Sequence, residues 1–169
     1  MAAISFRMPF GVQGDVVAPS LATIEAQAYN SALPFAQYGI AGKAASGKFV
    51  PVAAQNDVVY GFLCRPFPIT GANASDPLGT SAPSTLNMAD VLRRGYITVS
   101  VQLGAASAAM ASNVYLRYQN PSGSQIVGGV EGASTGNTYQ LTSTYSYGSG
   151  AYFMTPADGN GLALVSWNI

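Results

Sequence analysis

The sequence predicts an all-β protein with an antiparallel sandwich or barrel, and three observations lead to this prediction. First, 19 glycines and 10 prolines lie between short apolar runs along the 169 residues, as in domains built from many short strands. Second, residues 96–103 alternate strictly between polar and apolar side chains, which is the period of a strand. Third, no segment favours a long helix, since residues 105–111 suffice for one or two turns.

The first nineteen residues are predicted to form an extended arm, because two prolines and two glycines within them exclude a long helix. Residues 21–29 fit two patterns. With Ser20 as an N-cap, three apolar residues fall on one helical face, but alternation of apolar and polar residues fits a strand equally well. We favour the strand, because Pro34 follows soon after.

Residues 35–40 and 48–52 are predicted to pair as a hairpin around a turn rich in Gly, Ser and Ala. This turn resembles a phosphate-binding loop, but Phe49 stands where such a loop requires Ser or Thr. We therefore reject nucleotide binding. The next apolar run, residues 58–63, is a predicted strand that Pro66 ends.

The segment 71–87 is predicted to be a long exposed loop, because it contains two prolines, two glycines and several Ser and Thr residues. Ordered loops of this length are often functional. After it comes the clearest strand, residues 96–103. Shorter strands are predicted at five later places, which are residues 114–118, 125–130, 136–141, 145–152 and 162–167.

Charge and composition exclude several function classes. Seven basic and seven acidic residues give a net charge of zero, which is too little positive charge for electrostatic binding of nucleic acid. The chain has no histidine and one cysteine, so triads that use histidine, internal disulfides and multi-cysteine metal sites are excluded. No stretch reaches the roughly 20 apolar residues of a membrane-spanning helix. We expect no cofactor, no metal and no membrane partner.

The remaining reactive groups also favour a protein without catalysis. Four of the seven acids, Asp15, Asp57, Asp76 and Asp158, fall in predicted turns, where Asp is expected to bond to the backbone. No pair of carboxylates is singled out as glycosidase machinery. Cys64 ends an apolar strand and is predicted to be a buried thiol that acts as a small apolar side chain.

Two other features leave alternatives open. Arg93 and Arg94 precede the clearest strand and fit either contact with a partner's carboxylate or local pairing with Asp90 or Asp76. Tyr145 and Tyr147 are predicted to share a strand face. Such a face fits sugar stacking, cross-strand packing or a subunit interface.

The order of seven short segments carries a resemblance to a known family. They are Gly14–Val16, Ser20–Ala26, Gly47–Val52, Tyr60–Pro68, Arg94–Val99, Val114–Arg117 and Leu162–Ile169. In this order they resemble the structural cement, or decoration, proteins of tailed bacteriophages. The resemblance extends from about residue 14 to the end of the sequence and rests on the ordered set, not on any single motif.

The resemblance implies a jelly-roll-like subunit, a single domain over residues 1–169. It implies a homodimer or homotrimer that binds the outside of a shell of major capsid protein, with no catalytic residue and no small-molecule substrate. Such a protein would be made in the host cytoplasm and would stabilise the virion by bridging capsid subunits. An alternative, supported by the two tyrosines, is a carbohydrate-binding β-sandwich on a virion or cell surface.

We expect the intermolecular contacts in the arm, in the long loop and at the arginine pair. The arm and the loop offer main-chain groups and apolar side chains that can add to a neighbour's surface. The expected contact residues are Phe6, Met8, Phe10, Leu78, Leu86, Arg93 and Arg94.

Overall fold

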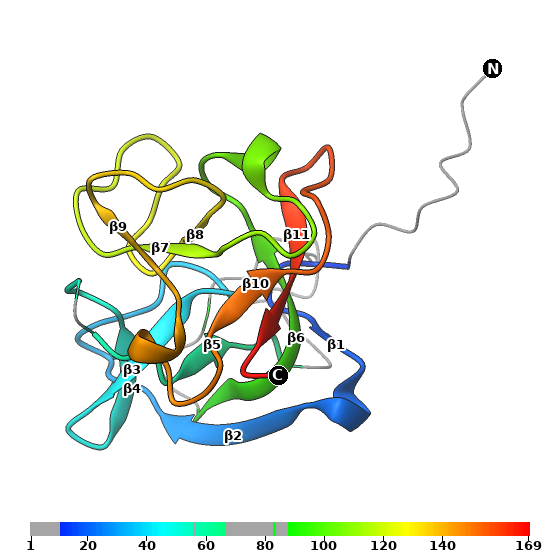
Figure 1. Ribbon diagram of the computed structural model, residues 1–169. Coiled ribbons are helices and arrows are strands. Elements are labelled where there is room, and N and C mark those ends of the chain that lie inside the picture. The colour runs from blue at the N-terminus through cyan, green and yellow to red at the C-terminus, as the bar shows by residue number, and fades with distance from the viewer. Residues whose placement is uncertain (1–10, 56, 67–82, 84–87) are drawn as a thin grey trace, which may run out of the picture.

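A computed structural model describes residues 11–55, 57–66, 83 and 88–169, and it confirms an antiparallel all-β fold. Two sheets and short 3-10 turns make up the described elements, none of which is an α-helix (Figure 1). The elements are β1 Val16–Val17, η1 Pro19–Leu21, β2 Thr23–Ala28, β3 Ala41–Ala45, β4 Lys48–Pro51, β5 Gly61–Leu63, β6 Met88–Ser100, η2 Ala105–Ser107, β7 Tyr115–Arg117, β8 Val130–Glu131, β9 Thr138–Gln140, η3 Ser143–Tyr145, β10 Ala151–Phe153 and β11 Leu162–Trp167.

The long strand β6 organises the larger sheet, in which the strand order is β10-β11-β6-β5-β3-β4. The first half of β6 pairs with β2 and β5, and its second half pairs with β1 and β11. Gly95 lies between the two halves with φ +137°, and a Cβ there would lie 3.0 Å from the Ala22 Cβ. Only glycine accommodates both the backbone angle and this close approach.

The smaller sheet, in the order β8-β7-β9, packs on the larger one to form a sandwich (Figure 1). Apolar side chains of both sheets meet in one core cluster, which includes Leu116 of β7, Val99 of β6 and Trp167 of β11. The Trp167 ring lies edge-on against Phe62 at 5.4 Å between ring centroids. Burial of this core provides the main driving force for folding.

The predicted strands are confirmed in several places and wrong in others. The strands expected at 21–29 and 162–167 appear as β2 and β11, and the second half of β6 includes most of residues 96–103. The expected hairpin forms around Ser46 and Gly47, but its first strand is β3, not residues 35–40. Strand pairing near residues 125–130 is limited to the two-residue β8.

Burial explains two of these differences. Residues 35–40 contain Phe35, Tyr38 and Ile40, which are buried in a second core cluster outside any strand. Thr98 was expected on a polar face but is fully buried, because residues 14–15 bond to both of its main-chain groups. The apolar run at residues 35–40 thus indicated burial correctly but did not distinguish a strand from a buried loop, whereas alternation did not predict the burial of Thr98.

The first nineteen residues fall partly outside the description. Residues 1–10 are not described, whereas residues 16–17 pair with β6 as the short strand β1. No helix in the described residues is long and apolar enough to cross a lipid bilayer.

Candidate functional site

The structure describes two of the seven expected contact residues, Arg93 and Arg94. Both lie on β6, next to the bulge in its pairing with β2. The other five, Phe6, Met8, Phe10, Leu78 and Leu86, lie outside the described residues.

Arg93 is engaged within the chain. Its Nε lies 3.4 Å from a Glu25 carboxylate oxygen, and its guanidinium lies 3.6 Å from the centre of the Tyr60 ring. The Tyr60 hydroxyl donates to the same carboxylate at 2.6 Å, and this bond raises the pKa of the phenol. Arg93 therefore pairs locally, as one of the two alternatives predicted, but its partner is Glu25 and not Asp90. Asp76, the other predicted partner, lies outside the described residues.

Arg94, by contrast, is exposed and forms no ion pair with any described residue. It lines a groove of about 350 Å³ between η1 and the second half of β6, together with Leu21, Tyr96 and Ile169. Leu21 is 63% exposed there. An arginine without an ion-pair partner among the described residues, beside an exposed aliphatic side chain, is suited to contact with another protein, since arginine is enriched at protein interfaces and burial of apolar surface favours association.

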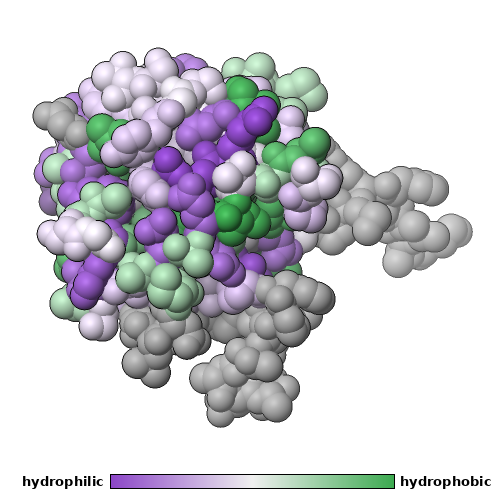
Figure 2. Space-filling model, turned by 90° about the horizontal axis from the view of Figure 1, so that it is seen from below, coloured by the Kyte–Doolittle hydropathy of each residue, from purple (hydrophilic) through white to green (hydrophobic). Residues whose placement is uncertain are grey.

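Further apolar side chains are exposed on β1, β2 and β6, outside the lining of this groove. Val17 of β1, Ile24 of β2 and Met88 of β6 are each more than one third exposed. We call Val17, Leu21, Ile24, Met88, Arg94 and Ile169 the contact surface. Figure 2 views the molecule from below, the side on which β2 lies in Figure 1, and shows green apolar residues among purple polar ones on that face.

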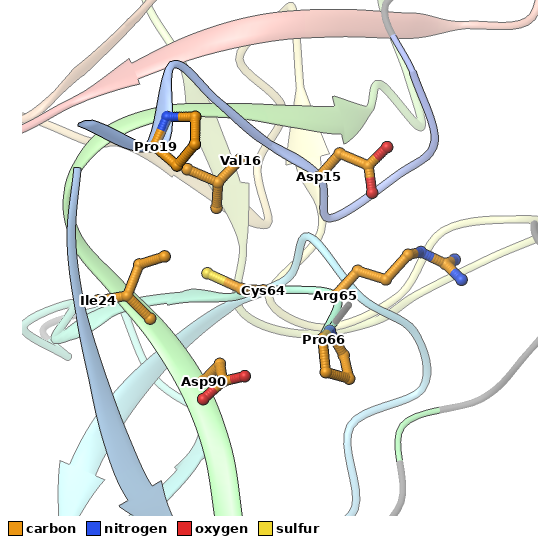
Figure 3. A pocket seen from close by; sticks show the side chains of 8 residues that line it. All are labelled: Asp15, Val16, Pro19, Ile24, Cys64, Arg65, Pro66 and Asp90. Carbon is orange, nitrogen blue, oxygen red and sulfur yellow. The ribbon is translucent and has the colours of Figure 1, made fainter. Parts of the chain in front are cut away.

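A second hollow, of about 460 Å³, adjoins the contact surface at Ile24 and is lined also by Val16, Pro19, Cys64 and Arg65 (Figure 3). Two carboxylates line it, but in Figure 3 Asp15 and Asp90 lie on opposite sides and the Asp15 carboxylate points away from Asp90.

The groups around this hollow do not form hydrolytic machinery. The Asp15 carboxylate accepts the Val12 amide at 2.8 Å, as expected of a turn residue. Cys64 is confirmed as a buried thiol, and burial raises its pKa to about 12. A thiol with so high a pKa is a poor nucleophile at neutral pH.

Two further turn acids also bond to backbone amides, as predicted, whereas Asp76 lies outside the described residues. Asp57 accepts from Ala53 and Ala54, and Asp158 accepts from Asn160 and Leu162. Within the described ranges, no three potential metal-ligating side chains come together.

The prediction that Tyr145 and Tyr147 share a strand face is wrong. Tyr145 ends η3 and its ring packs on Tyr139 at 5.0 Å, whereas Tyr147 is exposed and its ring packs on Tyr60 at 6.0 Å. The strand starts only at Ala151, because residues 146–150 form a glycine-rich turn in which Gly150 has φ +92°. The two rings therefore offer no common platform for a sugar.

Sequence reasoning missed the aliphatic part of the contact surface. Ile24 lies on the apolar face that alternation predicted in residues 21–29, yet its side chain is exposed, as is that of Leu21 in η1. Alternation marks which residues share a face of a strand, but not whether that face is covered.

Comparison with known proteins places these features in context. The model of the family described as XM1 gp53 minor capsid protein matches residues 1–167. A chain of the solved structure "The capsid of Myoviridae Phage XM1" is similar with a TM-score of 0.65 and 19% identity, and the match covers 98% of this chain and 95% of that chain. No curated protein matches.

Proposed function

Because the chain belongs to the XM1 gp53 minor capsid protein family, a family of phage virion proteins, we propose that it is a non-enzymatic cement protein. In this proposal it binds the outer surface of the capsid and bridges neighbouring subunits of the major capsid protein. It acts as a homodimer or homotrimer, so that several weak contacts add up to durable attachment.

The observation that carries the proposal is the contact surface. Arg94 and Leu21 line one groove, and the exposed Ile24 and Val17 lie on the neighbouring strands. A formal net charge of zero gives the subunit little long-range electrostatic attraction. Local apolar burial and one unpaired arginine are therefore the means of attachment that this surface offers.

The absence of catalysis in this proposal is supported by how the reactive groups are used. Asp57 and Glu131 are bound to cations, Asp15 and Asp158 are bound to turn amides, and the Cys64 thiol is buried. These groups hold the fold together.

The proposal is tested by binding of the purified protein to capsid shells that lack it. We expect saturable binding, and we expect the double substitution Leu21→Asp and Arg94→Glu to weaken it by about 30-fold or more, the effect of losing roughly 2 kcal/mol at an interface centre. Met110→Asp is the matched control, because Met110 is 74% exposed but follows η2, at the top of Figure 1 and far from β2.

Three outcomes would contradict the proposal. These are a lack of saturable binding to the shells, an equal loss from the control substitution, or a double variant that binds as the unmodified protein does. Unchanged thermal unfolding of the double variant establishes that the loss comes from contact and not from misfolding.

The undescribed arm belongs to the same proposal, with Phe6, Met8 and Phe10 as added apolar contacts. Deletion of residues 1–9 is expected to weaken attachment to shells while leaving the melting temperature of the isolated subunit almost unchanged. Substitution of Leu78 and Leu86 in the long loop is likewise expected to weaken attachment to shells while leaving the melting temperature of the isolated subunit almost unchanged. Mass measurement in solution, alone and with shells, distinguishes dimer from trimer.

A further inference from the structure

A groove of about 450 Å³ lies beside strand β10 and shares no lining residue with the contact surface, although Ser149 at its edge donates to the Ile169 carbonyl at 2.8 Å. Three segments form it, namely residues 111–113, residues 140–143 and residues 149–152. Isolated bridges join them, from Asn113 to Tyr152 and from Thr142 to Gly150. The lining consists of Ala111, Asn113, Gln140, Leu141, Thr142, Ser143, Ser149, Ala151 and Tyr152.

The groove has polar and apolar surface in similar amounts and carries no charged residue in its described lining. Asn113, Gln140, Thr142 and Ser143 present amides and hydroxyls, which both donate and accept hydrogen bonds. None of these four side chains bonds to another described residue, as the hydrogen bonds of the described chain show. Their hydrogen-bonding capacity is therefore available to a ligand.

One aromatic ring completes the lining. In β10 the side chains of Ala151 and Phe153 are buried, so Tyr152 between them points outward and is 37% exposed. An exposed tyrosine ring beside amides and hydroxyls offers an apolar surface next to polar groups. A sugar ring has the matching properties, with an apolar C–H face and hydroxyls around its edge.

We propose that this groove binds a neutral oligosaccharide, with Tyr152 stacked on one ring and the side chains of Asn113, Gln140, Thr142 and Ser143 bonded to hydroxyls. The volume lies within the range of roughly 300–1,000 Å³ typical of small-ligand sites. An anionic sugar gains nothing here, because no cation lines the groove.

This inference is independent of the proposed attachment to the capsid. None of the residues of the contact surface lines the groove. On a shell with many copies, weak single sites would combine into strong adhesion to a glycan-coated surface.

The test is a titration of the isolated, isotope-labelled protein followed by amide chemical shifts. The probes are chitotriose, cellotriose and maltotriose, each up to about 20 mM, since a shallow single site is expected to bind on the order of 1 mM. We expect saturable shifts with at least one trisaccharide, confined to amides of residues 111–113, 140–143 and 149–152. Tyr152→Ala is expected to lower the affinity by about 10-fold or more.

Tyr147→Ala is the matched control, because Tyr147 is more exposed than Tyr152 but packs on Tyr60, outside the groove. Gln140→Leu provides a second variant of similar size that removes the amide and keeps the apolar surface. The proposal is overturned if no trisaccharide produces saturable shifts, if the shifts lie elsewhere, or if the Tyr147 variant loses affinity as Tyr152→Ala does. Tyr152→Ala, Tyr147→Ala and Gln140→Leu must each retain the thermal unfolding of the unmodified protein.

Discussion

Two polar regions of the molecule use similar side chains in opposite ways. At the end of the β7–β9 sheet, Arg117, Gln119, Asn120 and Asn137 bond to one another or to nearby carbonyls. In the β10 groove, the side chains of Asn113, Gln140, Thr142 and Ser143 bond to no described residue. In the first region polar groups stabilise the loops, and in the second they remain free for a ligand.

The first region contains a buried ion pair, and its loss should have the largest effect on stability. Arg117 Nε donates to Glu131 at 2.6 Å, and these side chains are 3% and 0% exposed. Glu131→Gln leaves the guanidinium buried without its counter-charge, which is expected to cost about 3–5 kcal/mol of unfolding free energy. Denaturant unfolding measures it, and a loss below about 1 kcal/mol would mean that the pair is not buried as described.

The second ion pair, between Lys43 and Asp57, is expected to contribute less to the free energy of unfolding, and its contribution depends on pH. Burial alone would raise the pKa of Asp57, but hydrogen bonds from Lys43, Ala53 and Ala54 outweigh it and hold the pKa below its ordinary value. The folded state therefore binds the proton less tightly than the unfolded state. The resulting stability is present above the unfolded pKa, near 4, and disappears as pH falls through the lower folded pKa.

Asp57→Asn is the substitution that tests this pair, because asparagine still accepts from the two backbone amides but carries no charge. We expect it to cost about 1 kcal/mol at neutral pH. The difference from the unmodified protein should narrow below about pH 4 as Asp57 itself becomes protonated. A difference that stays constant from pH 7 to about pH 3 would contradict the depressed pKa.

These polar interactions show where sequence reasoning reaches its limit. The turn role of Asp57 followed from local chemistry, because an aspartate two to four residues from free amides bonds to them wherever the turn forms. The Arg117–Glu131 pair joins β7 to β8 across 14 residues. Its formation depends on strand register, which the short β8 did not reveal.

The candidate surfaces were also predictable only where local sequence patterns determine them, and not where distant segments meet. The all-β class and strands such as β11 followed from punctuation and alternation. Arg94 was singled out as one of a pair of cations, but only the fold shows that Arg93 is engaged by Glu25 and Tyr60 while Arg94 is not. The β10 groove combines three separate segments, so no local pattern could indicate it.

A third substitution tests the exposed hydrogen bonds at the end of the β7–β9 sheet. The Asn137 side-chain oxygen accepts from the amides of Gln119 and Asn120 at 3.2 and 3.3 Å. Asn137→Ala removes both bonds, but water replaces them at this exposed site, so we expect a loss of about 0.5–1 kcal/mol. Thermal unfolding measures it, and Gln125→Ala, which removes bonds within the 122–125 turn, is the control for a loop bond of similar type.

The smallest effect on stability is expected for substitutions in the β10 groove. These substitutions test most directly the contrast between the groove and the end of the β7–β9 sheet. Gln140→Ala combined with Thr142→Ala removes two side chains that bond to no described residue. Stability should stay within about 0.5 kcal/mol of the unmodified protein, as for exposed substitutions without partners. Polar side chains that contribute nothing to folding stability suit a binding site, since their hydrogen bonds form only with the ligand. A loss above about 1 kcal/mol would show that these side chains stabilise the fold after all, and the contrast between the two regions would then disappear.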